Sequence, residues 1–489
     1  MNRRFSFEII NHHAELSSLQ IIDSYKVNGC QIYITQDGQY LIIEPPLTKD
    51  VHSMYSQIME YLYHSLEPLD GTDDPIKYVE DHIWKEAEQQ AVTGLLSEHF
   101  QSLRYYLVRD ILGYGILDVL MRDENVEEIT VERFDRNVGL VHRKHTEFNI
   151  LNTNFQFGSF DLMNSFIQRL VQKSGNSVTT AMPIMNAMTK DGDRITVTYG
   201  NEISLPGPTI DIRKFTRAPL TIAHLLRMEA LDELITAYLW MLIDAKSFGL
   251  VIGETGSGKT TLINALIGMS NPRWKIVTIE ETPELKIPHY RWVRLVTRSS
   301  PMITRSNFDI TIMDLIKASL RMRPDFEVVG EVRGQEAQYL FQSAATGHGG
   351  LTSFHASGAE SALNRLSSEP INIKTGQHML LWYILHMTRL RDQNGNFVRK
   401  VISIKEVLSK SNSISFNEIF SYDRKTGLYD TRNIAHLLEK SVKVYDAAKI
   451  LNVEPEEDLQ SRISFLTRLK HAQTSNNNAC LDISQYYSK

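Results

Sequence analysis

Cysteine is nearly absent from this chain of 489 residues, which contains only Cys30 and Cys480. The two residues lie far apart in the sequence, and neither belongs to a CxxC motif or a Cys/His cluster of the kind that binds zinc. The sequence therefore predicts two reduced thiols and excludes a disulfide-stapled scaffold and a cysteine-based zinc module.

Long uninterrupted apolar runs are also missing. The first residues, MNRRFSFEIINHH, lack the apolar core of a signal peptide. The stretch LITAYLWMLIDAKSFGLVIG contains Asp244 and Lys246, and HMLLWYILHM is too short to cross a bilayer. We therefore expect a cytoplasmic protein, and docking on a membrane-embedded partner stays open.

Basic residues are not in excess, since 52 Lys and Arg stand against 58 Asp and Glu and the formal net charge is −6. A global basic footprint for nucleic acid is thus missing, although a local patch stays open. With 42% hydrophobic and 22% charged residues, the composition is that of an ordinary globular protein. The length allows two or three domains.

Three regions are expected along the chain. Residues 1–90 mix strand-like runs with a helical stretch and form an N-terminal accessory extension. Residues 91–218 combine a helix, a glycine turn and a strand with a hairpin in DRITVTYGNEISLPGPTIDIRKF, which is typical of a smaller α+β domain. In residues 219–489 the strand-length runs FGLVI, IVTIE, FEVVG and LTSFH alternate with helical patterns, which predicts an α/β domain with a parallel-rich sheet.

A phosphate-binding loop is predicted between a strand that ends at Ile252 and a helical pattern from Thr261 onward. Glycines in such a loop let backbone N–H groups turn toward phosphates, and the helix N-terminus adds partial positive charge. Lys259 would reach the β- and γ-phosphates of ATP, and Thr260 would offer its hydroxyl to Mg²⁺. The motif G-x-x-x-x-G-K-[ST] is matched by Gly253, Glu254, Thr255, Gly256, Ser257, Gly258, Lys259 and Thr260, and Thr261 completes the expected nucleotide site.

A carboxylate that polarises the attacking water is expected at Glu331. It follows the apolar strand 326–329 in RPDFEVVGEVRG, and Gly330 stands where many such NTPases carry a metal-binding aspartate. The alternative is a surface glutamate that caps the next helix.

Two further polar segments follow predicted strands. Glu280, Glu281 and Glu284 in IVTIEETPELKIPH are candidates to hold Mg²⁺-bound water or to pair with an arginine, and the alternative is a solvated loop. His348 and His355 in AATGHGGLTSFHAS are candidates to sense a γ-phosphate from the C-terminal edge of the sheet, and the alternative is a structural role.

Taken in this order, the four motifs resemble those of the hexameric secretion ATPases, which power type II secretion, type IV pilus assembly and archaellum assembly, with a related branch in type IV secretion. GETGSGKTTLINAL is similar to the Walker A of that superfamily, TIEETPEL to its acidic box, LRMRPDFEVVGEVRG to its Walker B and TGHGGLTSFHAS to its His box. The similarity reaches from GYGILDVLMRDENVEEITV to the C-terminal helical region.

The resemblance implies a RecA-like ATPase domain that binds ATP and Mg²⁺, with Glu331 as the catalytic carboxylate and the acidic and His boxes beside it. It also implies arginines that neutralise charge on the transferring phosphoryl group. The matching candidates are Arg194 in DGDRITV, Arg213 and Arg217 in IRKFTR, and Arg294 and Arg298 in VRLVTR. Each is equally compatible with a structural ion pair.

Members of this superfamily form homo-hexamers that work at the membrane through a polytopic platform protein. Bacterial type II secretion and pilus-extension members usually carry a tetracysteine zinc module, which this chain cannot build. YLIIEPPL, residues 40–47, resembles the archaeal branch instead, so archaeal pilus or archaellum assembly is favoured. The alternatives are a nucleic-acid-translocating RecA-like motor, a type IV secretion ATPase and a scaffold that binds nucleotide without turnover.

Overall fold

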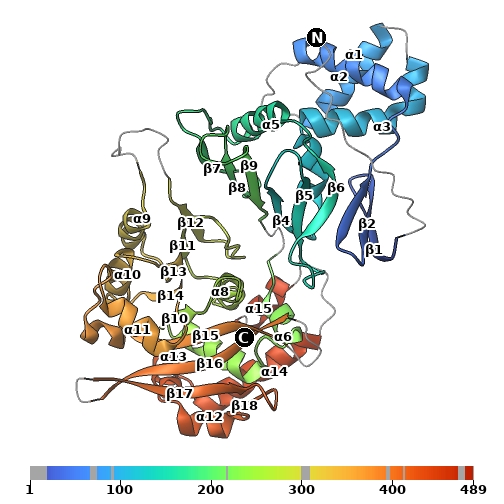
Figure 1. The fold of residues 1–489 in the computed structure, drawn as a ribbon. Helices are drawn as coiled ribbons and strands as arrows, with labels where there is room; N and C mark the ends of the chain where they lie inside the picture. The colour runs from blue at the N-terminus through green and yellow to red at the C-terminus, as the bar shows by residue number, and fades with distance from the viewer. Residues whose placement is uncertain are drawn as a thin grey trace. The chain divides into compact units, whose positions relative to one another are not determined.

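The computed structural model describes residues 19–65, 74–89, 93–215, 219–298, 309–391, 397–410, 413–471 and 479–487. The chain divides into two compact units, Met1–Arg217 and Ala218–Lys489 (Figure 1). Strands from the first 90 residues pair with strands from the following region, so the structure has two units where the sequence suggests three regions.

A mixed sheet forms the first unit. Its described strands are β1 (Ile21–Val27), β2 (Cys30–Thr35), β3 (Gln39–Ile43), β4 (Val126–Val131), β5 (Asn137–His142), β6 (Leu151–Gln156), β7 (Ile184–Met188), β8 (Arg194–Thr198) and β9 (Thr209–Arg213). They lie in the order β1-β2-β3-β6-β5-β4-β9-β8-β7, and the parallel contact between β3 and β6 joins the first hairpins to the rest. β8 and β9 pair antiparallel, so the predicted hairpin is confirmed.

The helices of the first unit pack in two places. α1 (Lys49–Ser65), α2 (Pro75–Gln89) and α3 (Thr93–Ile111) share a core that includes Ile58, Ile83 and Leu103. α5 (Phe160–Lys173) packs Phe166 and Leu170 against the inner face of the sheet, and the short α4 (Asp118–Arg122) precedes β4. Each Å² of apolar surface that these contacts remove from water stabilises the unit by about 25 cal/mol.

The second unit is an α/β domain, as predicted. Its described strands are β10 (Phe248–Ile252), β11 (Ile276–Glu280), β12 (Trp292–Val296), β13 (Phe326–Glu331), β14 (Gly349–Phe354), β15 (Leu381–Arg391), β16 (Phe397–Lys410), β17 (Ser413–Asp423) and β18 (Leu428–Tyr429). Their order is β12-β11-β13-β14-β10-β15-β16-β17-β18. The strands from β12 to β15 run parallel, and β16 to β18 continue the sheet antiparallel.

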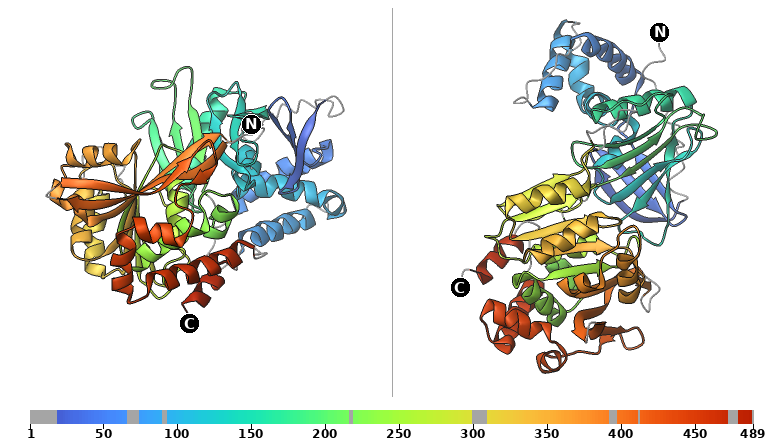
Figure 2. Two further views of the ribbon diagram at one scale, coloured as in Figure 1. Left: turned by 90° about the horizontal axis from the view of Figure 1, so that it is seen from below. Right: turned by 90° about the vertical axis from the view of Figure 1, so that its left-hand side faces the viewer.

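Helices cover both faces of this sheet, which is typical of a parallel sheet with two buried faces. Figure 2 shows the yellow and orange helices together on one side and the red C-terminal helices on the other. One face carries α9 (Ile312–Ser319), α10 (Glu336–Ala345) and α11 (Ala359–Ser367). The other face carries α6 (Ile222–Arg227), α7 (Glu233–Asp244), α8 (Lys259–Ile267), α12 (Ile434–Lys440), α13 (Lys443–Leu451), α14 (Pro455–His471) and α15 (Ala479–Tyr486).

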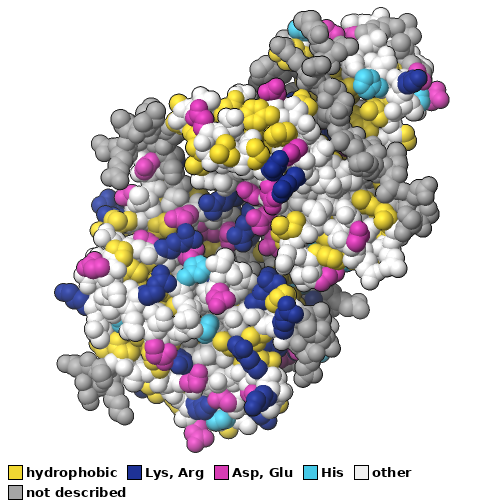
Figure 3. Space-filling model, in the orientation of Figure 1, with side chains coloured by type: hydrophobic (Ala, Val, Ile, Leu, Met, Phe, Trp, Pro, Cys, Tyr) yellow, Lys and Arg dark blue, Asp and Glu magenta, His cyan; other side chains and the backbone are white. Residues whose placement is uncertain are grey.

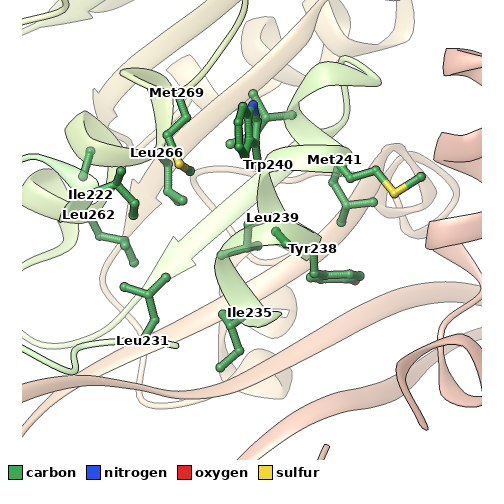
Figure 4. Close-up of a cluster of buried hydrophobic side chains, with 14 of the residues drawn as sticks. Ile222, Leu231, Ile235, Tyr238, Leu239, Trp240, Met241, Leu262, Leu266 and Met269 are labelled. Carbon is green, nitrogen blue, oxygen red and sulfur yellow. The ribbon is translucent and has the colours of Figure 1, made fainter. Parts of the chain in front are cut away.

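The apolar run LITAYLWMLID is the buried helix α7. Its side chains Ile235, Leu239 and Trp240 pack with Leu262 and Leu266 of α8 in one core (Figure 4). α7 is therefore apolar on all sides because it lies between the sheet and the C-terminal helices. Among the described residues, no helix combines the length and apolarity required to span a membrane.

A buried ion pair joins α14 to the end of α7. Arg462 donates from Nη1 to Oδ2 of Asp244 at 2.7 Å and from Nε to Oδ2 of Asp458 at 2.6 Å. The side chains of Arg462 and Asp244 are only 4% and 6% exposed. Removal of one partner from such a pair leaves an uncompensated buried charge.

Arg462→Ala is therefore expected to lower the free energy of unfolding by about 3–5 kcal/mol. The matched control is Arg468→Ala, because Arg468 lies on the exposed face of the same helix and should change stability by less than about 0.5 kcal/mol. Urea unfolding followed by tryptophan fluorescence measures both values. Equal losses for the two variants would contradict the importance of the buried pair.

Candidate functional site

The predicted phosphate loop connects the central strand β10 to α8, whose first residue is Lys259. Gly256 and Gly258 have φ angles of 75° and 95°, in the left-handed region that favours glycine. At Gly253 the reason for glycine is space, because a Cβ atom there would lie 2.1 Å from the carbonyl oxygen of Met387. Each glycine of the motif is thus required by local geometry.

The Lys259 ammonium group folds back over this loop. Its Nζ donates to the carbonyl oxygens of Gly253 and Glu254, both at 2.9 Å. Burial lowers the pKa of Lys259, and the nearby Glu331 carboxylate opposes that change. The side chain is therefore held inside the loop, where phosphate oxygens of a bound nucleotide would replace the carbonyl oxygens as acceptors.

The other loop residues differ in their exposure. Glu254 and Thr255 are exposed, whereas Thr260 and Thr261 are half-buried in the first turn of α8. The Ser257 hydroxyl is buried and has no hydrogen-bond partner among the described residues. An orphaned buried hydroxyl is costly unless a ligand or water satisfies it.

Glu331 lies at the end of β13, close to the phosphate loop. The pairing of β13 with β14 shifts register between Val329 and Glu331, so Gly330 acts as a local irregularity that re-aims the glutamate. One carboxylate oxygen, Oε1, lies 2.7 Å from Nε2 of His355, and the other, Oε2, accepts from Nη2 of Arg333 at 2.7 Å. Both contacts hold the carboxylate in one orientation.

His355 directly follows β14, which lies between β10 and β13 in the sheet. Parallel strands bring their carboxyl ends to one edge, so Lys259, Glu331 and His355 meet there. Burial and the positive charge of Lys259 lower the pKa of His355, whereas Glu331 acts in the opposite direction. His355 is therefore a neutral imidazole near pH 7 that pairs with the carboxylate.

His348 does not belong to this site. It precedes β14, whose first residues pair with the start of β10, so His348 lies at the opposite edge of the sheet. Its Nδ1 lies 2.9 Å from Oγ1 of Thr346, and its ring lines a separate cavity of about 810 Å³ together with Lys246 and Trp274. The prediction that both histidines face the γ-phosphate is therefore wrong for His348, because a strand of six residues separates them.

Glu280 of the acidic box faces the interior rather than the open edge. Its carboxylate Oε1 accepts from the backbone N–H groups of Glu284 at 2.7 Å and Leu285 at 2.8 Å, and the residue is only 3% exposed. A Cβ atom at Gly330 would lie 3.2 Å from its Cγ, so the missing side chain at Gly330 leaves room for it. The side chain therefore organises the loop that follows β11. Its Oε2 has no hydrogen-bond partner among the described residues, and a role of Glu280 in holding Mg²⁺ stays a prediction.

The other acids of the box are more open. Glu281 and Glu284 are exposed. The pKa of Arg333 is raised chiefly by its hydrogen bond to Glu331, and the charge of Glu281 adds to this effect. Of the three acids, only Glu281 is therefore both exposed and close enough for its charge to act on Arg333, the hydrogen-bond partner of Glu331.

Burial raises the pKa of Glu280 to about 7, against the two backbone hydrogen bonds that favour its charged form. A carboxyl group whose pKa is raised on folding costs stability as pH rises from its ordinary value toward 7. Glu280→Gln removes this titration and keeps an oxygen acceptor. The free energy of unfolding of Glu280→Gln relative to the wild type should therefore increase between pH 5 and pH 8, by up to about 3 kcal/mol.

Glu280→Ala is the contrasting variant. It leaves two buried N–H groups without an acceptor and should be less stable than Glu280→Gln by about 1–3 kcal/mol at both pH values. Thermal unfolding at the two pH values distinguishes these effects. A constant difference between Glu280→Gln and wild type would show that the carboxyl group does not titrate in this range.

The candidate arginines fall into two groups. Arg194 and Arg213 belong to the first unit, where they are exposed and face each other across β8 and β9. Like charges directly opposite are unfavourable unless an anion lies between them. Arg217 lies outside the described residues.

The other two candidate arginines belong to the second unit. Nε of Arg294 lies 3.8 Å from Oε2 of Glu280, and the backbone of Arg298 forms an isolated antiparallel β-bridge with that of Ile310.

Two arginines at the site were not among the predictions. Arg333 follows Glu331 by two residues and donates to its carboxylate. The short spacing of the two charges in GEVRG is a local signal that indicates this contact. Arg399 of β16 donates from Nε to the carbonyl oxygen of Gly256 at 2.9 Å. It lies 143 residues from that glycine, so no local pattern could have indicated the contact.

The residues present fit a magnesium nucleotide. Mg²⁺ prefers oxygen ligands and keeps several waters, so the Thr260 hydroxyl together with phosphate oxygens would form a suitable donor set. Three or more His, Cys, Asp or Glu side chains grouped for an all-protein metal site do not occur in the described part of the chain.

The second unit thus has the fold of a RecA-like P-loop domain: a central parallel strand, a glycine loop that leads into a helix, and a glutamate at the end of a nearby strand. The chain belongs to the family described as Type II/IV secretion system protein, which matches residues 117–479. The match covers the sheet of the first unit from β4 onward and the whole glycine-loop site.

Known relatives come from archaea and bacteria. The "Uncharacterized protein MJ0900" of Methanocaldococcus jannaschii is 29% identical over 459 residues, which are 88% of this chain and 81% of that protein. The "Type IV secretion system protein PtlH" of Bordetella pertussis is 42% identical over 132 residues, 27% of this chain and 38% of that protein. The solved pilus retraction motor PilT with bound ADP is 15% identical with a TM-score of 0.43, covering 76% of this chain and 96% of that chain.

Proposed function

We propose that this protein is a cytoplasmic ATP hydrolase whose turnover powers the assembly of a type IV pilus-like or archaellum surface filament. The observation that carries the proposal is the meeting of Lys259, Glu331 and His355 at one edge of the sheet, in a chain of the secretion family. A lysine in a glycine loop and a carboxylate beside it are the parts that ATP hydrolysis needs.

In this proposal each residue has one task. Lys259 binds the β- and γ-phosphates, and Thr260 holds Mg²⁺, which neutralises phosphate charge when bound. Glu331 orients the attacking water and accepts its proton. His355 and Arg333 keep the carboxylate of Glu331 in place, at 2.7 Å each. Glu281 adds negative charge near this cluster, and Glu280 holds the loop from which Glu281 projects.

The working form is a homo-hexamer at the inner face of the cell membrane, bound to a polytopic platform protein. Arg194 and Arg213 are an exposed pair without a carboxylate partner in the described residues, and they would supply positive charge to a phosphoryl group. With nucleotide present, the particle mass should be close to six times the 56.0 kDa protomer mass. Light scattering measures it, and a persistent monomer would contradict this part.

Secretion rather than filament assembly is the second candidate, and the similarity to the Bordetella protein favours it. A nucleic-acid motor receives less support. On the face drawn in Figure 3, dark-blue Lys and Arg side chains are interspersed with magenta Asp and Glu side chains over the described residues. Stimulation of ATP turnover by DNA, but not by membranes that contain the platform protein, would favour the nucleic-acid motor.

Gene deletion and complementation test the proposed function in the cell. The wild-type gene should restore surface filaments to the deletion strain, and Lys259→Ala should not. Glu360→Gln is the matched control, because Glu360 is an exposed residue whose ion pair with Lys405 contributes little. A deletion strain that keeps its filaments and loses protein export would support the secretion alternative.

A further inference from the structure

The antiparallel pair β15 and β16 continues beyond the phosphate loop as a two-stranded ribbon. Met387 pairs with Val401, Arg389 with Arg399, and Arg391 with Phe397. Directly paired residues and alternate residues of a strand share one face of a sheet. These six side chains therefore form a continuous row on one face, which we call the ribbon face.

The ribbon face lies on the same side of the sheet as α8. Met387 and Val401 belong to the apolar core that includes Leu262 and Leu266 of α8. Farther along the ribbon, Arg389 and Arg399 therefore pass the N-terminal end of α8. This end of the helix is where the loop directs its N–H groups toward phosphates.

Direct contacts tie the ribbon face to the loop. Arg399 donates from Nε to the carbonyl oxygen of Gly256 at 2.9 Å. At Gly258, a Cβ atom would lie 3.0 Å from Cε of Met387 and 3.2 Å from Cδ of Arg399. The aliphatic parts of the Met387 and Arg399 side chains thus lie against the outer side of the phosphate loop, next to Gly258.

An exposed aromatic side chain continues this row. Phe397 is 39% exposed, and the guanidinium carbons of Arg389 and Arg391 lie 3.6 Å and 4.6 Å from its ring centroid. In the described part of the chain, no carboxylate forms an ion pair with Arg389, Arg391 or Arg399. A phenyl ring beside guanidinium planes is a surface on which a nucleobase stacks.

We infer that the ribbon face is the nucleoside subsite of this protein. Phe397 and Arg389 stack on the base, and Arg399 holds the phosphate loop in place beside the ribose. The inference rests on the proposed function, since it concerns the same nucleotide. The phosphates occupy the loop, and the nucleoside leaves it beside the first turn of α8, toward the ribbon face. A planar nucleobase matches the aromatic and cationic groups there.

Comparison of ATP with inorganic tripolyphosphate tests the subsite, because tripolyphosphate has the phosphates and lacks the nucleoside. Titration calorimetry with Mg²⁺ should be carried out in the Glu331→Gln background, which prevents turnover. Phe397→Ala should weaken ATP binding roughly tenfold to hundredfold and change tripolyphosphate binding by less than about twofold. Phe397→Trp should bind ATP like the parent, because it keeps an aromatic face.

The controls separate the possible failures. Arg424→Ala, an exposed arginine in the turn between β17 and β18, should leave both affinities unchanged. Unchanged ATP binding in Phe397→Ala, or equal loss for both ligands, would overturn the subsite while the proposed hydrolase stands. Failure of the parent protein to bind either ligand would overturn the proposed function and the subsite together. Loss of binding to anionic vesicles in Phe397→Ala, with ATP binding intact, would assign the ribbon face to a lipid surface instead.

Discussion

Lys259→Ala lowers kcat/KM for ATP hydrolysis by about 10²–10³-fold in the expected result. The ammonium group is the charged donor inside the glycine loop, and it already lies 2.9 Å from two loop carbonyl oxygens. Alanine removes the charge that meets the β- and γ-phosphates, and each tenfold loss corresponds to about 1.4 kcal/mol of transition-state stabilisation. Phosphate release under steady-state conditions measures the change.

Lys246→Ala is the matched control for this variant. Lys246 is also a lysine next to β10, but it precedes the strand and pairs with Asp325 at 2.8 Å at the opposite edge of the sheet. Its removal should change kcat/KM by less than about twofold, since an exposed ion pair contributes about 0–1 kcal/mol. Equal activity of the Lys259→Ala and wild-type proteins would exclude the glycine loop as the site of turnover.

Glu331→Gln is expected to reduce kcat by about 10²–10⁴-fold and to leave nucleotide affinity nearly unchanged. Glutamine keeps the size of the side chain and loses the carboxylate that accepts the proton of the attacking water. The contact of the carboxylate with His355 and the charged hydrogen bond from Arg333 are lost as well. Single-turnover hydrolysis and equilibrium binding of ATP separate the effect on chemistry from the effect on binding.

Glu360→Gln provides the comparison for a surface carboxylate, with kcat expected within about twofold of the wild type. If Glu331→Gln turned over ATP at the wild-type rate, another residue would have to serve as the base. Exposed Glu281, whose charge acts on Arg333, would then be the next residue to replace.

Much of the fold was predictable from local patterns. The alternation in β8 and β9, with Ile195, Val197, Ile210 and Ile212 all buried, is visible in the sequence as β-branched residues at every second position. The glycine loop was predictable because positive φ angles and close backbone approach admit glycine and few other residues. For the apolar run 234–252 the sequence argued only against a membrane span, because Asp244 and Lys246 interrupt it, and the structure shows its first part as the buried helix α7.

The two histidines of AATGHGGLTSFHAS mark the limit of such patterns. They are seven positions apart in the printed sequence, yet β14 lies between them and carries them to opposite edges of the sheet. At about 3.3 Å per residue, a strand of this length separates its ends by roughly 20 Å. Only the direction of β14 relative to β10 decides which of them, His355, reaches the phosphate loop.

By itself the sequence determined the features that depend on neighbouring residues: the α/β class, the glycine loop, and the strand ends that carry Glu280, Glu331 and His355. These features follow from steric limits and hydrophobic periodicity within a few residues. The tertiary structure alone decided that Glu280 turns inward, that His348 leaves the site and that Arg399 joins it. Strand order and register set those contacts, and they depend on the packing of segments that lie far apart in the chain.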